Sequence, residues 1–397
     1  MFPFDLCVLG GCGRVGLPLA LCFADKGLKV AIHDINNEAV AKVNQKVLPF
    51  REDGAQALLD RVLGKTLVVE NNPALISQAA HVIVVIGTPV DEHLNPQFSR
   101  LIHFFEQLSE QLVDGQLIVL RSTLFPGSTE RLSQLLLNRQ KRVHVSFCPE
   151  RIAEGKAVEE LKSLPQIVSG CDAKAVEMAT RLFSHLAEHI VPLAPFEAEL
   201  AKLFTNAWRY IQFSIANQFY MMSQNFGADF YRIYDAMRYH YPRTEGFPRA
   251  GFVAGPCLFK DTMQLASFNN NNFMLGHSAM LINEGLPNFI VDQLRRRRDL
   301  SQATVGILGM AFKANVDDPR ESLSYKLRKV LQFECQRVLC HDPLMGHGPE
   351  LVDLQTLLAE SQVVILGAPH DTYRQLQFPP SVEVVDVWNF FPKENPA

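Results

Sequence analysis

One of the eight cysteines, Cys257, has neighbours that can activate a thiol. It follows a loop that contains glycine and proline, and Lys260 and Asp261 come one helical turn later. A thiol between a loop and a helix can be held as thiolate by the helix N-terminus and a nearby ammonium, and the thiolate is the nucleophilic form. The same spacing also fits an ordinary buried cysteine, which is the more common case. Cys257 is therefore a candidate nucleophile that spacing alone does not establish.

A second group of polar side chains lies in an apolar segment with helical spacing. Glu199, Lys202 and Asn206 recur at intervals of three and four residues, which places them on one face of a helix. An inward-facing lysine and amide need a partner or a task, because burying an unsatisfied polar group is costly. An exposed stripe with a Glu199–Lys202 ion pair fits the spacing equally well, so both interpretations stay open.

The N-terminal segment carries a glycine pattern typical of dinucleotide binding. Gly11, Gly13 and Gly16 form GxGxxG between an expected strand and an expected helix, where the backbone can approach a pyrophosphate closely. Asp34 ends the next expected strand, where a carboxylate accepts hydrogen bonds from a ribose 2′-hydroxyl and repels a 2′-phosphate. No arginine follows Asp34, so the pattern favours NAD over NADP. Asp34 could alternatively cap the following helix.

Two other expected strand ends carry small polar residues. Thr88 lies in the segment 87–89, and Thr123 lies in the segment 122–127. Open α/β sheets bind ligands at the carboxyl ends of their parallel strands. Helix caps and turns use the same residue types, so this pattern alone does not choose between a ligand site and a cap.

The elements that would position these residues follow an α/β, helical, α/β order. Strand-like runs alternate with amphipathic segments up to about residue 195, and separations of this length require crossover connections and a parallel, doubly wound sheet. Helical spacing dominates 197–240 and 275–297. We expect division into 1–196, 197–298 and 299–397. The expected strands are 5–10, 29–34, 81–87, 116–121, 142–147, 303–309, 337–342, 362–367 and 382–387.

Composition narrows the class of protein. The 397 residues are 47% hydrophobic, enough for a core in each of two to three domains. With 38 basic and 42 acidic residues, the net charge of −4 gives no broad attraction to nucleic acid or to an anionic membrane. The N-terminus lacks signal-peptide features, no apolar run reaches the roughly 20 residues of a membrane span, and the cysteines form no CxxC pair. We therefore expect a cytoplasmic protein without disulfides or a metal site.

Seven segments, in order along nearly the whole chain, resemble the UDP-glucose/GDP-mannose dehydrogenase family. Each segment alone is a weak signal, but seven in register are specific, and they favour the functional interpretations above. The segments are GCGRVGLPLA with Asp34, IGTP (86–89), RSTLFPGSTE (121–130), CPERIAEGKA (148–157), AELAKLFTNAWR (198–209), GPCLFKD (255–261) and AFKANVDDPRES (311–322).

The resemblance implies two Rossmann-like domains joined by a helical dimerisation region. NAD would bind the first domain and the nucleotide of a nucleotide sugar the second, in a homodimer or higher homo-oligomer. The family reaction consumes two NAD⁺ and one water, and it converts a C6 alcohol through an aldehyde and a cysteine thioester to the uronate. A thiolate adduct is chemically sensible here, because an aldehyde must become tetrahedral before it can expel a hydride.

The resemblance also implies roles for individual residues. By motif position Cys257 is the nucleophile, and Lys202 and Asn206 hold the developing oxyanion. Asp261 and a water near Thr123 would transfer protons. A cation and an amide aimed at the oxygen of the adduct would stabilise its charge in a dry site.

Further roles follow in the same way, and Glu150 would act as an acid or base in the thioester steps. The implied cofactor-binding residues are Gly11, Gly13, Arg14, Val15, Gly16, Asp34, Thr88 and Thr123. The implied substrate-binding residues are Glu150, Lys202, Asn206, Arg243, Gly255, Lys260 and Lys313, with Arg243 reaching the nucleotide of a neighbouring subunit.

The sequence departs from many relatives at two places. The loop 252–256 is poorer in glycine, and Asp386 is followed by Val387-Trp388-Asn389, where many relatives have an arginine. The pair Lys260-Asp261 resembles the glucose- and mannose-type enzymes, so UDP-glucose is the first substrate expected. GDP-mannose and UDP-N-acetylhexosamines are alternatives. A single-step β-hydroxyacid dehydrogenase and a catalytically silent binding protein are the rival functions.

Overall fold

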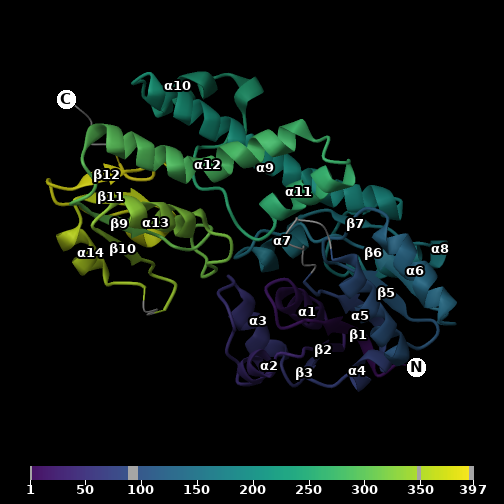
Figure 1. The fold of residues 1–397 in the computed structure, drawn as a ribbon. Coiled ribbons are helices and arrows are strands. Elements are labelled where there is room, and N and C mark those ends of the chain that lie inside the picture. The colour runs from purple at the N-terminus through teal and green to yellow at the C-terminus, as the bar shows by residue number, and fades with distance from the viewer. Residues whose placement is uncertain (1, 88–96, 347–349, 393–397) are drawn as a thin grey trace. The chain divides into compact units, whose positions relative to one another are not determined.

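The computed structural model describes residues 2–87, 97–346 and 350–392. The chain forms two compact units, Met1–Thr205 and Asn206–Ala397. Figure 1 shows the elements of both units. No helix among the described residues is both long enough and apolar enough to cross a membrane.

The first unit is built on a six-stranded sheet with the order β3-β2-β1-β4-β5-β6. Every neighbouring pair of strands is parallel, as the long connections between the strand-like runs predict. After β6 in the sequence, β7 and β8 form a separate short parallel sheet of two strands. The strands are β1 (Phe4–Leu9), β2 (Val30–His33), β3 (Leu67–Glu70), β4 (Ala79–Val84), β5 (Leu117–Leu120), β6 (His144–Phe147), β7 (Gln166–Val168) and β8 (Ile190–Pro192).

Helices cover both faces of the six-stranded sheet. Along β1, Leu6 and Val8 join one hydrophobic core, whereas Cys7 and Leu9 join the other, because successive side chains point to opposite faces. The first core includes residues of α1 (Gly16–Asp25), α3 (Ala55–Val62) and α8 (Ala173–Phe183). The second core includes residues of α4 (Ala74–Ser77), α5 (Phe98–Gln111) and α6 (Ser128–Asn138). The sheet is doubly wound, as expected. The remaining helices of this unit are α2 (Asn37–Asn44) and α7 (Ala157–Ser163).

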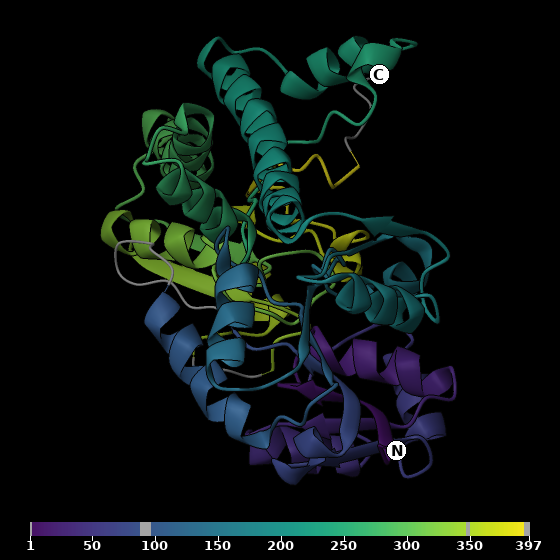
Figure 2. The same ribbon diagram turned by 90° about the vertical axis from the view of Figure 1, so that its right-hand side faces the viewer.

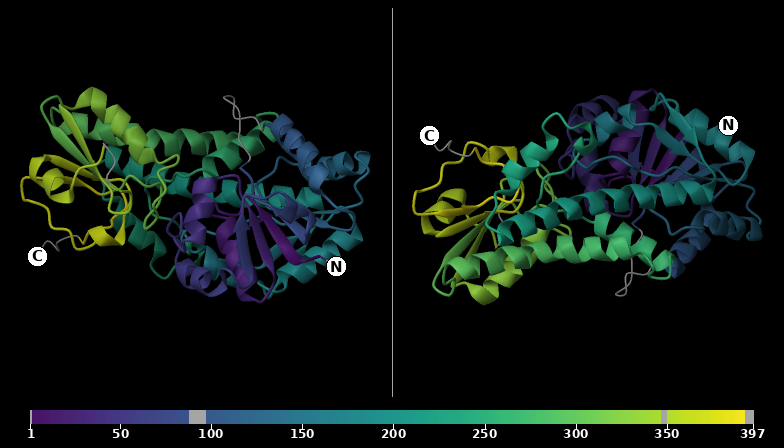
Figure 3. Two further views of the ribbon diagram at one scale, coloured as in Figure 1. Left: turned by 90° about the horizontal axis from the view of Figure 1, so that it is seen from below. Right: turned by 90° about the horizontal axis from the view of Figure 1, so that it is seen from above.

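A helical section follows, beginning with α9 (Pro195–Asn225), which Figure 2 shows as one unbroken helix. The later part of α9 lies beside α12 (Met274–Arg297), as both views of Figure 3 show. Asn217 on α9 donates a hydrogen bond to Asn283 on α12 over 2.9 Å. Between these helices come α10 (Phe230–Arg238), η1 (Pro242–Thr244) and α11 (Leu258–Phe268).

The C-terminal strands form a four-stranded parallel sheet with the order β10-β9-β11-β12. Val305 and Ile307 of β9 face a core shared with α12 and α13, whereas Leu308 faces the core that contains Leu357 of α14. The α/β, helical, α/β order is therefore confirmed. These elements are β9 (Thr304–Leu308), α13 (Leu323–Glu334), β10 (Arg337–His341), α14 (Leu354–Glu360), β11 (Val363–Leu366), η2 (Asp371–Tyr373) and β12 (Glu383–Val385).

Candidate active site

The glycine loop between β1 and α1 has the close packing that a dinucleotide site requires. A Cβ atom on Gly16 would lie 2.7 Å from the Cα atom of Gly11, and a Cβ on Gly11 would lie 2.8 Å from the Ile32 side chain. A Cβ on Gly13 would meet only the Gly10 carbonyl, at 3.7 Å. Gly11 and Gly16 thus serve the packing of strand and helix, while Gly13 leaves the backbone open to a ligand. These residues fit an NAD pyrophosphate.

Asp34 ties the second strand to the glycine loop and does not cap α2. One carboxylate oxygen accepts a hydrogen bond from the backbone N–H of Cys12 (2.9 Å), and the other accepts one from Asn36 (2.9 Å). The N-cap of α2 is Asn36, whose side chain accepts from Ala39. The alternative that Asp34 caps the helix is therefore wrong. A buried carboxylate fixed beside the loop is placed to accept a ribose hydroxyl as well, since each oxygen has two lone pairs.

The other residues implied for the cofactor differ in their surroundings. Arg14 forms an ion pair with Glu154 (2.6 Å) and stacks over Phe50, so its guanidinium joins the glycine loop to the segment 148–157. Val15 is the N-cap residue of α1. Thr123 is half-buried beyond the end of β5. Thr88 lies outside the described residues.

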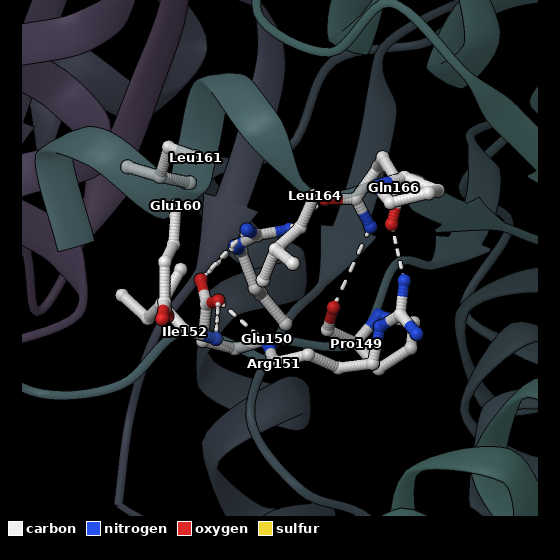
Figure 4. Close-up of a pocket in the computed structure, with 10 residues that line it drawn as sticks. Pro149, Glu150, Arg151, Ile152, Glu160, Leu161, Leu164 and Gln166 are labelled. Carbon is white, nitrogen blue, oxygen red and sulfur yellow. Dashed lines mark hydrogen bonds and ion pairs between the residues drawn. The ribbon is translucent and has the colours of Figure 1, made fainter. Parts of the chain in front are cut away.

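Glu150 is an anion held in place by four nitrogen atoms. Its carboxylate accepts from the guanidinium of buried Arg121 (2.6 and 2.8 Å) and from the backbone N–H groups of Arg151 (2.7 Å) and Ile152 (2.8 Å). Figure 4 shows this carboxylate in a small pocket that Gln166 also lines. Arg121 donates a further bond to Gln166 (3.0 Å), which fixes the guanidinium. This geometry makes Glu150 a rigid charge; its role in proton transfer stays a prediction.

On α9, Glu199 and Lys202 are both buried, which excludes an exposed stripe. The Glu199 carboxylate accepts from the backbone N–H groups of Gly127 (2.5 Å) and Thr129 (2.8 Å) and from the Thr129 hydroxyl (2.6 Å). It thereby caps the N-terminus of α6, and burial raises the pKa of this carboxyl above its ordinary value. Glu199 therefore serves the fold. Among the described residues of the first unit, none forms a hydrogen bond or ion pair with the Lys202 ammonium.

Asn206 and Asp261 form a buried pair in the second unit. The Asn206 amide donates to a carboxylate oxygen of Asp261 over 2.6 Å, and Asp261 is fully buried. The Lys260 ammonium lies 3.7 Å from the other oxygen of Asp261. An amide has two N–H donors, so Asn206 can hold Asp261 with one and present the second to a substrate oxygen. The structure thus joins two residues that the sequence separates by 55 positions.

Cys257 is the N-cap residue of α11, with Asp261 one turn further along the helix. Of the eight cysteines, all within the described residues, Cys257 alone is exposed. The N-terminal N–H groups and the dipole of a helix favour negative charge at this position. The expected junction of loop and helix is therefore present, and it provides an accessible thiol with a carboxylate buried behind it.

The remaining residues implied for the substrate lie in loops of the second unit. Arg243, in η1, is exposed and stacks on Tyr241. Gly255 has a φ of +104°, which favours glycine, and a Cβ there would lie 2.6 Å from the ring of Phe312. Lys313 is half-buried in the loop after β9. Their roles stay predictions.

Two charged residues of the site region escaped the sequence reasoning, namely Arg121 and Glu154. Both lie inside segments that match the family, but neither has a spacing that marks it, because each acts on a partner distant in sequence. Arg121 contacts Glu150, and Glu154 contacts Arg14. Buried charges need partners of opposite sign, so asking what neutralises Glu150 is the signal that points to Arg121.

Comparisons with known proteins agree with this architecture. Three domains of the UDP-glucose/GDP-mannose dehydrogenase family match the chain in order: the NAD binding domain at 5–187, the central domain at 196–284 and the UDP binding domain at 306–393. A UDP-N-acetyl-D-mannosamine dehydrogenase of Pyrococcus horikoshii is 28% identical over 93% of this chain and 90% of its own. An NDP-N-acetyl-D-galactosaminuronic acid dehydrogenase of Ralstonia nicotianae is 25% identical, with coverages of 92% and 91%.

Two solved structures share the fold. The UDP-D-ManNAc dehydrogenase from Pyrococcus horikoshii has a TM-score of 0.90 at 26% identity, covering 98% of this chain and 96% of that one. A UDP-glucose dehydrogenase from Pyrobaculum islandicum has a TM-score of 0.89 at 24% identity, with coverages of 97% and 98%. The similarity therefore extends over the whole chain.

Proposed function

The chain belongs to the UDP-glucose/GDP-mannose dehydrogenase family of NAD-dependent nucleotide-sugar dehydrogenases, and we propose that it oxidises the sugar C6 alcohol to the carboxylate through a thioester on Cys257. The observation that carries the proposal is the exposed thiol at the N-cap of α11, one turn from the buried Asn206–Asp261 pair. A single oxidation to an aldehyde needs no thiol. In a four-electron oxidation a thiolate has a task, because the aldehyde must become a tetrahedral adduct before it can lose the second hydride.

The residues divide the work as follows. The Cys257 thiolate adds to the aldehyde carbon, which forms a C–S bond and places negative charge on the former carbonyl oxygen. Lys202 and the second N–H of Asn206 stabilise that oxygen, as fixed donors do in a site from which water is excluded. Loss of hydride then leaves the thioester. Water adds to the thioester, the C–S bond breaks, and the carboxylate departs.

Proton movements complete the balance. One alcohol and one water yield one carboxylate, two hydrides and three protons. NAD, when bound at the glycine loop, would supply the acceptor for one hydride in each oxidation. Asp261, next to Asn206 and Lys260, and a water near Thr123 take up protons from the alcohol and from the attacking water. Glu150, fixed by Arg121, serves the hydrolytic step as a base. Lys313 and Arg243 are proposed to bind the nucleotide, with Arg243 acting on that of a neighbouring subunit.

UDP-N-acetyl-D-mannosamine is the substrate we propose to test first, because relatives named for that activity align with more than nine-tenths of this chain. UDP-glucose, which the residue pair Lys260-Asp261 favours in the sequence, is the second candidate. We further propose that the enzyme works in the cytoplasm as a homodimer or larger homo-oligomer and supplies uronates for surface polysaccharide.

The test is a panel of nucleotide sugars scored by moles of NADH formed per mole of sugar consumed. The panel contains UDP-N-acetylmannosamine, UDP-glucose, GDP-mannose and UDP-N-acetylgalactosamine. A ratio of two with one of them supports the proposal. A ratio of one indicates a single-step dehydrogenase, and binding of NAD and sugar without any NADH indicates a silent binding protein. Either result rejects the proposal.

A further inference from the structure

The loop that leads to Cys257 begins at Gly251, and the indole ring of Trp388 packs directly against that glycine. A Cβ atom on Gly251 would lie 2.3, 2.4 and 2.6 Å from three ring carbons of Trp388. Real Cβ contacts are essentially never this short, so only glycine fits beneath the ring. Trp388 lies just beyond β12, two residues after Asp386. The ring of Trp388 thus packs against the residue that directly precedes the loop 252–256.

The backbone N–H and carbonyl of Gly251 both form hydrogen bonds with a side chain of α9. The Asn217 side chain accepts from the Gly251 N–H (2.8 Å) and donates to the Gly251 carbonyl (3.1 Å). The same Asn217 amide donates to Asn283 of α12, which in turn donates to the carbonyl of Tyr210. Since Asn217 and Asn283 are fully buried, this is a satisfied polar network that fixes one backbone position.

Trp388 is itself fixed. Its indole N–H donates to the Gly367 carbonyl (3.0 Å), and its backbone N–H donates to Asp386 (3.0 Å). Asp386 also accepts from the backbone N–H groups of Phe390 and Phe391, which follow in the chain. Arg249, two residues before Gly251, donates to the Asn389 carbonyl (3.0 Å). These hydrogen bonds therefore hold the ring in a fixed position against Gly251.

The other end of the loop has a similar contact. Gly255 packs against the ring of Phe312, and its N–H donates to the Glu321 carbonyl (3.4 Å). Between the two glycines, Phe252 and Val253 are buried. Cys257 follows two residues after Gly255. Aromatic rings from the C-terminal part of the chain thus hold both ends of the loop, and the thiol stays exposed.

We propose that Trp388 is a positioning residue for Cys257: by holding Gly251 against Asn217, its ring fixes the path of the loop and the placement of the thiol at the N-cap of α11. The proposal rests on the proposed function for its kinetic consequence. The packing argument does not depend on that function. A displacement of about 1 Å from a distant substitution can slow a reaction by on the order of a hundredfold, because attack needs a near-contact geometry.

A double-mutant cycle tests the contact between Gly251 and Trp388. The proteins are wild type, Gly251→Ala, Trp388→Ala and the double variant, and the readouts are kcat, KM and the rate of Cys257 alkylation by iodoacetamide, followed on the Cys257 peptide by mass spectrometry. We expect each single change to lower kcat by about tenfold while KM for the nucleotide sugar changes less than about twofold. Alkylation is expected to slow in parallel.

The double variant decides the matter. With the ring removed, the Cβ atom introduced by Gly251→Ala has room, so the double variant should be no slower than Trp388→Ala alone. If the two effects multiply, or if neither single variant changes kcat or alkylation, the proposal is wrong. Gly285→Ala is the matched control, because a Cβ at that helical position of α12 meets nothing within 4 Å. It should leave both rates unchanged.

Two further points keep the outcome interpretable. If Gly251→Ala does not fold, Trp388→Phe replaces it, because phenylalanine keeps a ring but loses the bond to Gly367; kcat and alkylation should then fall between wild type and Trp388→Ala. If wild-type protein forms no NADH with any sugar of the panel, the proposed function fails. The four alkylation rates then still decide whether Trp388 positions the thiol.

Discussion

At the scale of residues, the cysteines differ in what surrounds them. Burial raises the pKa of the Cys7 and Cys12 thiols to about 12, and that of Cys22 and Cys340 to about 11, so these thiols stay protonated and inert at neutral pH. Cys257 is the exposed one, at a helix N-terminus. Exposure and position, rather than the residue type, are the reasons for proposing it as the nucleophile.

Replacing the thiol should uncouple the two oxidations. Cys257→Ser puts a much weaker nucleophile at the N-cap of α11, so the aldehyde forms no thioester and at most one NADH arises per sugar. The measurement is NADH yield against sugar consumed, with the product identified by mass spectrometry. Cys335→Ser is the control, because this half-buried cysteine ends α13 and should keep the full yield. Two NADH from Cys257→Ser would rule out the thioester route.

A substitution at Asp261 can distinguish a role in proton transfer from a role in holding the fold. In Asp261→Asn the new amide oxygen can still accept the bond from Asn206, so the fold should persist, while the carboxylate that takes up protons is gone. We expect kcat to fall about 10²- to 10⁴-fold, the range typical of general acid–base groups. Thermal unfolding of the variant checks that the pair still forms. An Asp261→Asn enzyme with wild-type kcat would leave Asp261 only a structural role.

At the scale of elements, most strands and the helical section could be predicted because apolar runs with crossover-length gaps have few other solutions. The short strands β3, β7 and β8 were not among the expected ones. The contacts between side chains of different elements could not be predicted. Helical spacing predicts that Asn206 shares a face with Lys202, but not that it meets Asp261. Nothing local relates Trp388 to Gly251. Such contacts depend on how whole elements pack, and no short window of sequence contains that information.

A histidine-aspartate pair occurs at the end of one strand in each of the two sheets, and the sequence motifs did not single it out. β2 ends at His33 and β10 ends at His341, and each histidine is followed by an aspartate, Asp34 or Asp342. In both sheets the strand-end histidine carbonyl accepts from a glycine N–H of the first loop, and the aspartate accepts from the next backbone N–H groups of that loop. The two sheets thus use one device to fix the loop after their first strand. In the second sheet the carboxylate also accepts a bond from His370, since the other ring nitrogen of His370 accepts from Asn315.

These hydrogen bonds predict that the contribution of Asp342 to the stability of the protein depends on pH. Burial opposes its charge, but the bonds from His370 and from the backbone N–H groups of Leu344 and Ala311 hold the pKa below the ordinary 3.8. A lowered pKa means that the ionised form stabilises the fold above pH 3.8, and that this stabilisation is lost as pH falls through the lower folded value. Asp342→Asn should reduce the free energy of unfolding by about 2 kcal/mol at pH 7, because one amide group must face backbone donors.

Denaturant unfolding at a series of pH values checks this prediction. The difference between wild type and Asp342→Asn should stay constant from pH 7 to pH 5. It should shrink below about pH 3.8, where the unfolded chain takes up a proton at Asp342 that the folded protein binds only at lower pH. Asp292→Asn, a change at an exposed side chain of α12, is the control and should show no such difference. A gap that persists unchanged at pH 3 would show that the charge of Asp342 contributes nothing.

At the scale of the whole molecule, α9 has two opposite faces with different tasks. Asn206, Tyr210 and Asn217 are buried on one face. The opposite face carries large apolar side chains that are exposed, and at 3.6 residues per turn they lie within about 40° of a single line along the helix. These are Phe204, Trp208, Ile215, Phe219 and Met222, and the exposed Phe226 follows directly after the end of the helix. Exposed apolar surface of this extent marks a contact with another protein, and a stripe on one long helix can pair with its own copy about a two-fold axis.

The stripe therefore predicts a homodimer that charge on α9 should dissociate. Trp208→Glu combined with Met222→Glu places two carboxylates in a self-contact, where each would meet its own copy or apolar carbons, so association should be lost while the buried face and the fold persist. Sedimentation velocity at micromolar concentration gives the mass, and circular dichroism confirms the helices. Phe333→Glu changes an aromatic residue on α13 that is more exposed than Trp208 or Met222 but lies outside the stripe, and it should keep the wild-type mass. If wild type is a monomer, or if the α9 variant keeps the wild-type mass, then the stripe does not form the subunit contact, and a second copy cannot be what covers it.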